Sequence, residues 1–214
     1  MLTNEQEKKL EALRGKVSEI ISGKRLSHTF GVEREIASLS SIYEPDEEYR
    51  LRAAALLHDI TKQKTFEEQI ALCDELLIAH AREDALMPKT LHARTAVGVI
   101  RRDFPEFADD YILSAIRYHT TGRRDMRTAE KLLYLADYIE DTRTFEDCVR
   151  LREYFYSRLG DCHDADSRRR LLDDTLILSF DMTIRGLIDE GTPVHQDTFE
   201  ARNYLIEEKE FEQQ

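Results

Sequence analysis

The chain has 214 residues, which fits one compact domain, and its 43 acidic residues against 31 Lys and Arg give a net charge of −12. So acidic a chain lacks the broad basic field that neutralises nucleic-acid phosphates, and we expect no nucleic-acid partner. Its hydrophobic residues, 41% of the total, fall in short periodic pieces, and no apolar run approaches about 18 residues. This pattern argues against disorder and predicts no membrane span.

The first segment, MLTNEQEKKLEALRGK, carries charge throughout and has no apolar stretch or small-residue cleavage site. We therefore expect no secretion signal and a cytoplasmic location. Cys73, Cys148 and Cys162 are odd in number and widely separated, with no CxxC pair among them. Free thiols in a reducing compartment fit this spacing better than disulfides or a thiolate zinc site.

Helical periodicity runs along almost the whole chain. In the first three predicted helices apolar residues recur at helical spacing: Leu10, Leu13, Val17 and Ile20, then Phe30, Ile36 and Leu39, then Leu51, Ala54 and Leu57. Further helices are predicted at about 66–79, 90–104, 108–119, 128–140, 144–158, 167–189 and 197–207. Turn signals separate them, and no stretch alternates as a strand would. We predict one all-α domain, 1–214, of about eight to ten helices.

Four histidines stand near helix ends or on partly apolar faces, in RLSHTFG, ALLHDITK, KTLHART and AIRYHTTG: His28, His58, His92 and His119. Neutral imidazole binds borderline divalent metals, and a carboxylate can bridge two ions. Taken singly, a buried histidine more often bonds a backbone carbonyl than a metal. Asp59 follows His58 directly, and both can face one ion only if the helix ends there, because neighbours on a helix point about 100° apart.

In order along the chain, these residues and the aspartate of YLADYIED match the H…HD…H…H…D pattern of HD-domain phosphohydrolases, which they resemble over residues 25–140: His28, His58, Asp59, His92, His119 and Asp137. RLSHTFGV, ALLHDITK, LHARTAVG, AIRYHTTGRRDM, EKLLYLADYIEDTR and HQDTFEARNYL are more specifically similar to the YqeK-type symmetrical diadenosine tetraphosphate hydrolases. The resemblance implies an HD-domain helical bundle with a core at about 24–140, on which N-terminal and C-terminal helices pack.

The resemblance also implies a centre of two divalent transition-metal ions, with iron expected and manganese, cobalt or zinc as alternatives. Asp59 would bridge the ions, His28, His58 and Asp137 would complete one shell, and His92 and His119 would serve the other. A metal-bridging hydroxide would then cleave diadenosine tetraphosphate into two ADP. Another HD phosphohydrolase activity, as a nucleotidase or a cyclic-nucleotide phosphodiesterase, stays open. So do a non-catalytic nucleotide-binding regulator and a homodimer.

An acidic protein that binds a polyphosphate needs local positive charge. Lys62, three residues after Asp59, is the strongest candidate, and we expect these two residues to act in catalysis. Four arginines near the motifs are further candidates for substrate contact, although each could equally pair with surface acids: Arg25, Arg94, Arg123 and Arg143. The resemblance adds Thr120, Thr121 and Gly122 as phosphate contacts, while the same residues could simply terminate a helix.

Several other residues have a structural explanation. His80 lies in polar sequence and is predicted to be a surface residue, as is His163 within GDCHDADSRRR, residues 160–170, which we predict to be a solvated connection. His195 could either help to start the last helix or close the pocket. Three residues around Asp137 are predicted to lie in the core rather than to stack on a base: Tyr134, Leu135 and Tyr138.

Overall fold

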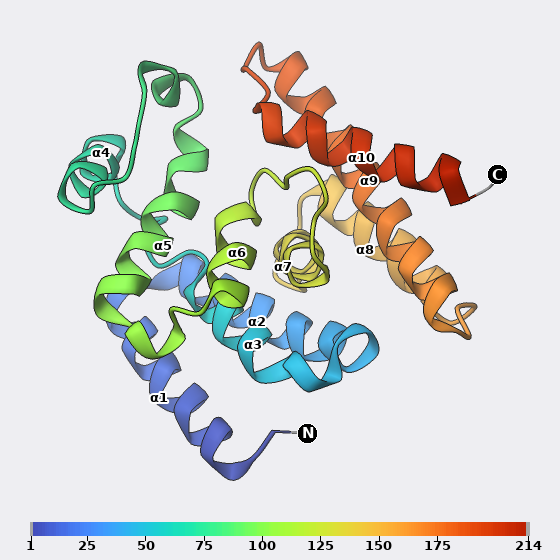
Figure 1. Ribbon diagram of the computed structural model, residues 1–214, viewed down its shortest axis with the longest axis horizontal. Coiled ribbons are helices and arrows are strands. Elements are labelled where there is room, and N and C mark those ends of the chain that lie inside the picture. Colours follow the sequence, from blue (N-terminus) through green and yellow to red (C-terminus); the bar gives the residue numbers. More distant parts are fainter. Residues whose placement is uncertain (1, 213–214) are drawn as a thin grey trace.

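The computed structural model describes residues 2–212, and within that range the chain is helical, without strands (Figure 1). This confirms the predicted all-α class. The ten α-helices are α1 (Asn4–Ile20), α2 (Gly23–Tyr43), α3 (Glu48–Leu57), α4 (Phe66–Glu75), α5 (Leu91–Asp103), α6 (Asp110–Tyr118), α7 (Thr128–Ile139), α8 (Glu146–Leu159), α9 (Ala165–Asp189) and α10 (Gln196–Glu212). Short 3-10 turns η1 (Pro45–Glu47), η2 (Arg82–Leu86), η3 (Pro88–Thr90) and η4 (Pro105–Phe107) join some of them.

Helix ends follow local capping chemistry. The Thr65 hydroxyl accepts a hydrogen bond from the backbone N–H of Glu68, and the Glu68 carboxylate accepts one from the backbone N–H of Thr65, so α4 starts with a capping box. Asp164 caps α9 in the same way, through Ser167. The prediction of a solvated connection over 160–170 was therefore wrong from residue 165 onward. His163 is exposed, as predicted, and so is His80.

The helices pack around α2, α3 and α7. α2 lies against both α3 and α7, α3 contacts α6, and α8, α9 and α10 cover the far side of α7 (Figure 1). Tyr134 is fully buried, with its ring 4.7 Å from that of Phe180, and Leu135 is buried beside it. The core assignment of these two α7 residues is confirmed, and Tyr138 packs against the same core at the edge of a cavity. Within residues 2–212 no helix is both long and apolar enough to cross a bilayer.

The first three helices are tied together by a buried carboxylate. The Glu33 side chain of α2 is 5% exposed and accepts from Arg14 of α1 at 2.9 Å and from Arg52 of α3 at 3.1 Å. Burial of a charge is tolerated here because both oxygens are paired. Removal of the carboxylate would leave two guanidinium groups without this partner.

We expect Glu33→Ala to lower the free energy of unfolding by about 3 kcal/mol, because one partner of a buried ion pair is lost. Urea denaturation followed by circular dichroism measures it. Glu5→Ala is the control, since Glu5 pairs with Lys9 while both side chains are exposed, and it should leave the denaturation midpoint unchanged. Equal midpoints for the two variants would show that Glu33 does not hold these helices together.

Candidate metal centre

Five segments bring their polar side chains to one buried point. α3 ends at Leu57, and the turn that follows allows His58 and Asp59 to face the same side. The other contributors are the second turn of α2, the first turn of α5, the C-terminal cap of α6 and the last turn of α7. Together these elements place all six predicted ligands in one cluster: His28, His58, Asp59, His92, His119 and Asp137.

Asp59 lies between two pairs of histidines. Its Oδ1 is 3.2 Å from Nε2 of His92 and 3.7 Å from Nε2 of His119. Its Oδ2 is 3.3 Å from Nε2 of His58 and 3.7 Å from Nε2 of His28. Each carboxylate oxygen therefore faces a different histidine pair. Asp137 stands on the His28 side only, with its Oδ1 2.8 Å from Nε2 of His28.

The outer nitrogen of each imidazole is held by an acceptor. The Nδ1 contacts are His28 to Glu140 Oε1 at 2.9 Å, His58 to Ala55 O at 2.7 Å, His92 to Lys89 O at 2.8 Å and His119 to Ile116 O at 2.6 Å. When Nδ1 donates to a carbonyl or carboxylate, Nε2 keeps its lone pair, and the ring direction is fixed. All four histidines thus turn an Nε2 acceptor toward the cluster.

The acceptors at the centre fit a cation. Nε2 of His28, Nε2 of His58 and Oδ1 of Asp59 are buried and have no hydrogen-bond partner within residues 2–212. Unsatisfied buried acceptors cost about 1–3 kcal/mol each unless something binds them. Two groups have ligand atoms within 4.8 Å of one another: His28, His58 and Asp137, and His58, Asp59 and His119. Imidazole and carboxylate together suit divalent transition metals.

Electrostatics favour the protonation states that ligate metal. Burial and the nearby Lys62 ammonium lower the pKa of His92 to about 3, and burial also lowers the pKa of His119. Burial alone would raise the pKa of Asp59, but the imidazoles of His58, His119 and His92 around its oxygens outweigh this effect and hold that pKa well below its usual range. At neutral pH the centre thus combines neutral imidazoles at His92 and His119 with an ionised carboxylate at Asp59.

Four of the residues predicted to contact substrate border the cluster. Arg25 pairs with Asp59 at 2.5 Å, and Arg143 pairs with Asp137 at 2.7 Å. The Lys62 ammonium lies 3.1 Å from Nδ1 of His92, and Thr120 Oγ1 lies 3.2 Å from Nε2 of His119. Thr121 is buried next to Thr120.

Arg94, Arg123 and Gly122 are not brought to the cluster. Arg94 follows His92 by two positions, about 200° around the helix, and it pairs instead with Asp84 at 2.6 Å. Arg123 is held by the buried Glu130 at 3.0 Å. Gly122 has a positive φ of 65°, and an added Cβ would lie 2.7 Å from the Phe180 ring, so this glycine serves helix packing.

A cavity of about 510 Å³ opens above the cluster, and His119, Thr120 and Asp137 lie on its wall. The rest of its lining comes from separate parts of the chain: Lys62; Leu86, Met87, Pro88, Lys89 and Thr90; Thr121; Tyr138 and Arg143; Thr183 and Leu187; and Thr192, Pro193, His195 and Thr198. His195 lines the cavity and its Nδ1 accepts from the Asp197 backbone at 3.1 Å, so both roles considered for it are present. Tyr138 packs against the core, as predicted, with its ring stacked on Tyr134, and it also lines the cavity.

Glu140 is a positioning residue that the motif does not contain. It is fully buried at the C-terminal cap of α7, where it accepts from Nδ1 of His28 and from Thr142 Oγ1 at 2.7 Å. It follows Asp137 by three positions, a spacing that puts both side chains on one helix face. This spacing from Asp137 is the sequence signal that could have identified Glu140.

We expect Glu140→Gln to weaken metal binding about 10- to 100-fold, because the amide is a weaker acceptor for the His28 ring and no longer fixes its orientation. Metal titration of chelator-treated protein gives the affinity. Glu130→Gln is the matched control, since Glu130 is equally buried on α7 but bonds Ser114 and Arg123 rather than a histidine of the cluster. If both variants bind metal as the unmodified chain does, Glu140 has no role in orienting His28.

Fold and site together define an all-helical protein with a buried histidine–aspartate centre. The HD domain model matches residues 25–142, more than half of the sequence, and the chain belongs to the HD-domain family. The resemblance inferred from the motifs is thereby confirmed.

Curated relatives match along most of their length. Proteins named symmetrical bis(5'-nucleosyl)-tetraphosphatase are 30% identical in Halalkalibacterium halodurans, over 86% of this chain and 90% of the relative, and 30% identical in Bacillus subtilis, over 89% and 94%. A solved structure from Clostridium acetobutylicum, described as a predicted HD superfamily hydrolase involved in NAD metabolism, is 32% identical with a TM-score of 0.78. It covers 92% of this chain and 97% of its own.

Proposed function

We propose that this protein is a metal-dependent hydrolase that cleaves diadenosine tetraphosphate symmetrically into two ADP. The substrate and the symmetry are supported by the names of the relatives, which match over at least 86% of this chain. The metal dependence is supported by one observation above all, the position of Asp59 with each oxygen facing a different pair of histidine nitrogens.

In this proposal His28, His58 and Asp137 hold one ion, His92 and His119 hold a second, and Asp59 is shared between the two. Iron is the proposed metal, and the same ligands suit manganese, cobalt or zinc. When bound, two such ions lower the pKa of a shared water, supply the nucleophile and neutralise phosphate charge.

The protein's own groups bind and orient the polyphosphate. Lys62 and Arg143 line the cavity beside the cluster and would take the phosphate oxygens, with hydroxyl contacts from Thr120 and Thr121. Arg25 forms an ion pair with Asp59 and so offsets the charge of this carboxylate. The phosphorus that lies in line with the nucleophile is the one attacked, so the register of the phosphate chain against Lys62 and Arg143 would decide where the bond breaks.

Assays of metal-loaded protein against a nucleotide panel test the proposal. Diadenosine tetraphosphate should give ADP with a kcat/KM at least about tenfold above those for nucleoside monophosphates and cyclic nucleotides. A preference for monophosphates would indicate a nucleotidase, and a preference for cyclic nucleotides a phosphodiesterase. Tight binding without turnover would indicate a regulatory module.

A further inference from the structure

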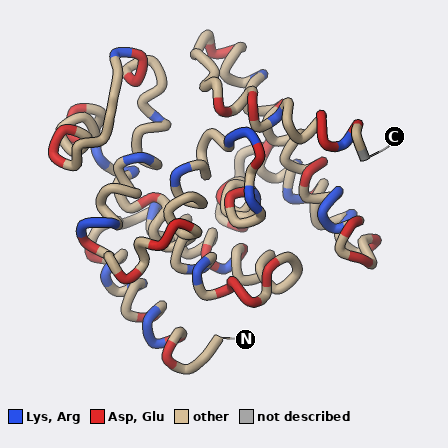
Figure 2. The backbone as a smooth tube through the Cα atoms, viewed as in Figure 1, with Lys and Arg blue, Asp and Glu red and all other residues tan. Residues whose placement is uncertain are grey.

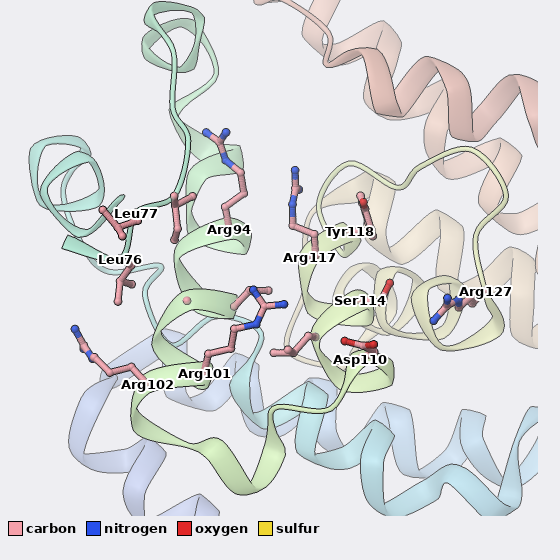
Figure 3. A pocket seen from close by; sticks show the side chains of 14 residues that line it. Leu76, Leu77, Arg94, Arg101, Arg102, Asp110, Ser114, Arg117, Tyr118 and Arg127 are labelled. Carbon is pink, nitrogen blue, oxygen red and sulfur yellow. The ribbon is translucent and has the colours of Figure 1, made fainter. Parts of the chain in front are cut away.

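A second cavity lies between α5 and α6, on the side of these helices away from the metal centre. It is an open groove of about 800 Å³ (Figure 3). His92 and Arg94 mark the two faces of α5, because residues two positions apart point about 200° apart around a helix. The groove is thus built on α5 and α6, the helices that also place His92 and His119. It shares no lining residue with the cavity above the metal centre.

The groove concentrates positive charge. Five arginines line it: Arg94, Arg101, Arg102, Arg117 and Arg127. Among the described residues of its lining, Asp110 is the one acid. Elsewhere in the view of Figure 2, acidic and basic residues are interspersed along the helices, as expected of a chain with a net charge of −12. The arginine-rich lining is therefore a local departure from the composition of the chain.

Three of the five, Arg101, Arg117 and Arg127, have guanidinium groups with no hydrogen-bond or ion-pair partner among the described residues, and of these Arg101 and Arg117 lie between α5 and α6. Arg94 and Arg102 are neutralised, by Asp84 at 2.6 Å and by Glu75 and Asp103 at 2.5 and 2.7 Å. Within residues 2–212, no hydrogen bond or ion pair is formed by the guanidinium of Arg101 or of Arg117, and the latter lies 5.1 Å from the centre of the Tyr118 ring.

The charged guanidinium of Arg117 is destabilised when no anion is bound beside it. Arg117 is half-buried, and burial lowers the pKa of its guanidinium, since a charge removed from water without a partner is destabilised. Figure 3 shows Arg117 rising beside Arg94 from the facing helix, with Arg101 reaching between the two helices, whereas Arg102 points away. A multiply charged anion between α5 and α6 would pair with the guanidinium groups of Arg101 and Arg117. The planar guanidinium matches phosphate oxygens in particular.

The opposite wall of the groove is apolar. Leu76 and Ile78 follow α4 and pack onto α5 at Gly98, where an added Cβ would lie 2.8 Å from each side chain. Val97 and Leu113 extend this surface along the two helices. An occupant therefore needs a phosphate chain at one end and a flat, weakly polar body at the other.

We propose that the groove between α5 and α6 is a second ligand site, which binds a nucleoside polyphosphate with its phosphates on Arg101 and Arg117 and its nucleoside on the Leu76–Ile78 wall. The site is distinct from the metal centre, and the proposal does not depend on the hydrolytic activity. The phosphate chemistry is shared with inorganic polyphosphate, and the apolar wall favours the nucleotide.

Calorimetric titration of the full-length, chelator-treated protein with ATP and with tripolyphosphate tests the site. ATP should bind, and Arg101→Ala and Arg117→Gln should each weaken binding about tenfold, with about a 100-fold loss in the double variant. Arg150→Ala removes an exposed charge from α8 and is the control for net charge, with no change expected. Lys62→Ala, at the metal-centre cavity, should also leave this binding event intact.

Circular dichroism of each variant checks folding, and Arg101→Ala alone suffices if the Arg117 variants unfold, because Arg101 is exposed. Equal ATP affinity in the unmodified protein and Arg101→Ala would overturn the site. Loss of binding in Lys62→Ala but not in Arg101→Ala would place the nucleotide in the metal-centre cavity and also overturn it. Equal affinity for tripolyphosphate and ATP would overturn the nucleoside part of the proposal.

Discussion

Asp59→Ala should reduce the turnover of diadenosine tetraphosphate by at least about 10³-fold while leaving the helical content unchanged. Among the described residues, 2–212, Asp59 is the one carboxylate whose two oxygens face both histidine pairs, so its loss removes negative charge and spacing from both halves of the centre. Metal centres contribute several kcal/mol of charge stabilisation to such reactions, and each 1.36 kcal/mol is about tenfold in rate. Lys62→Ala should cost less, about 10- to 100-fold, because it removes one point charge from a substrate that the metals also hold.

Turnover, bound metal and circular dichroism are measured on the same preparation of each variant. Asp141→Ala is the matched control, because its exposed carboxylate pairs with Arg34 close to the centre without entering it, and it should keep full activity. A folded Asp59→Ala protein with two metals and near-native turnover would remove Asp59 from the mechanism and leave it as a helix-end residue.

Removal of metal should abolish turnover and lower the thermal midpoint of unfolding. Within the part of the chain that the structure describes, the buried Nε2 atoms of His28 and His58 have no hydrogen-bond partner. A cation that binds them in the folded chain alone stabilises that state by about 2.7 kcal/mol at 100 times its Kd. Thermal denaturation and activity assays before chelation, after chelation and after metal return measure both effects.

Elemental analysis of anaerobically prepared, fully active protein should give two transition-metal ions per chain. His163→Ala is the control, because this histidine is exposed and lies outside the cluster. It should change neither the stoichiometry nor the midpoint. Saturation at one ion per chain in fully active protein would contradict the two-metal centre.

The clustering of the six histidine and aspartate side chains could be predicted because each position lies within a short stretch of recognisable sequence. The predicted end of α3 at His58 was needed for both His58 and Asp59 to face the cluster, and the helix does end at Leu57. Arg94 shows the limit of proximity in sequence. It stands two positions from His92, and helical phase alone directs it to the opposite face, where it pairs with Asp84. The helical phase of Arg94 relative to His92 could be worked out from the sequence, whereas its closeness to the His92 motif did not predict which residues it contacts.

Features that depend on tertiary contacts could not be predicted from the local sequence. The cavity above the metal centre is lined from residues 86–90 and from residues 192–198, which meet only because α9 and α10 fold back over α7. Glu140 had a signal in its spacing from Asp137, but its burial follows from the approach of α2 that delivers His28. Gly122 could be a phosphate contact or a helix terminator by sequence, and only the position of Phe180 shows why a glycine is required there.

Hydrolysis of diadenosine tetraphosphate in ¹⁸O-labelled water, followed by mass spectrometry of the products, tests the central proposal most directly. Attack of a water-derived hydroxide on one of the two middle phosphorus atoms predicts two ADP per turnover, with one heavy oxygen in one of them. ATP and AMP as products, or ADP without label, would contradict symmetrical hydrolysis at this centre.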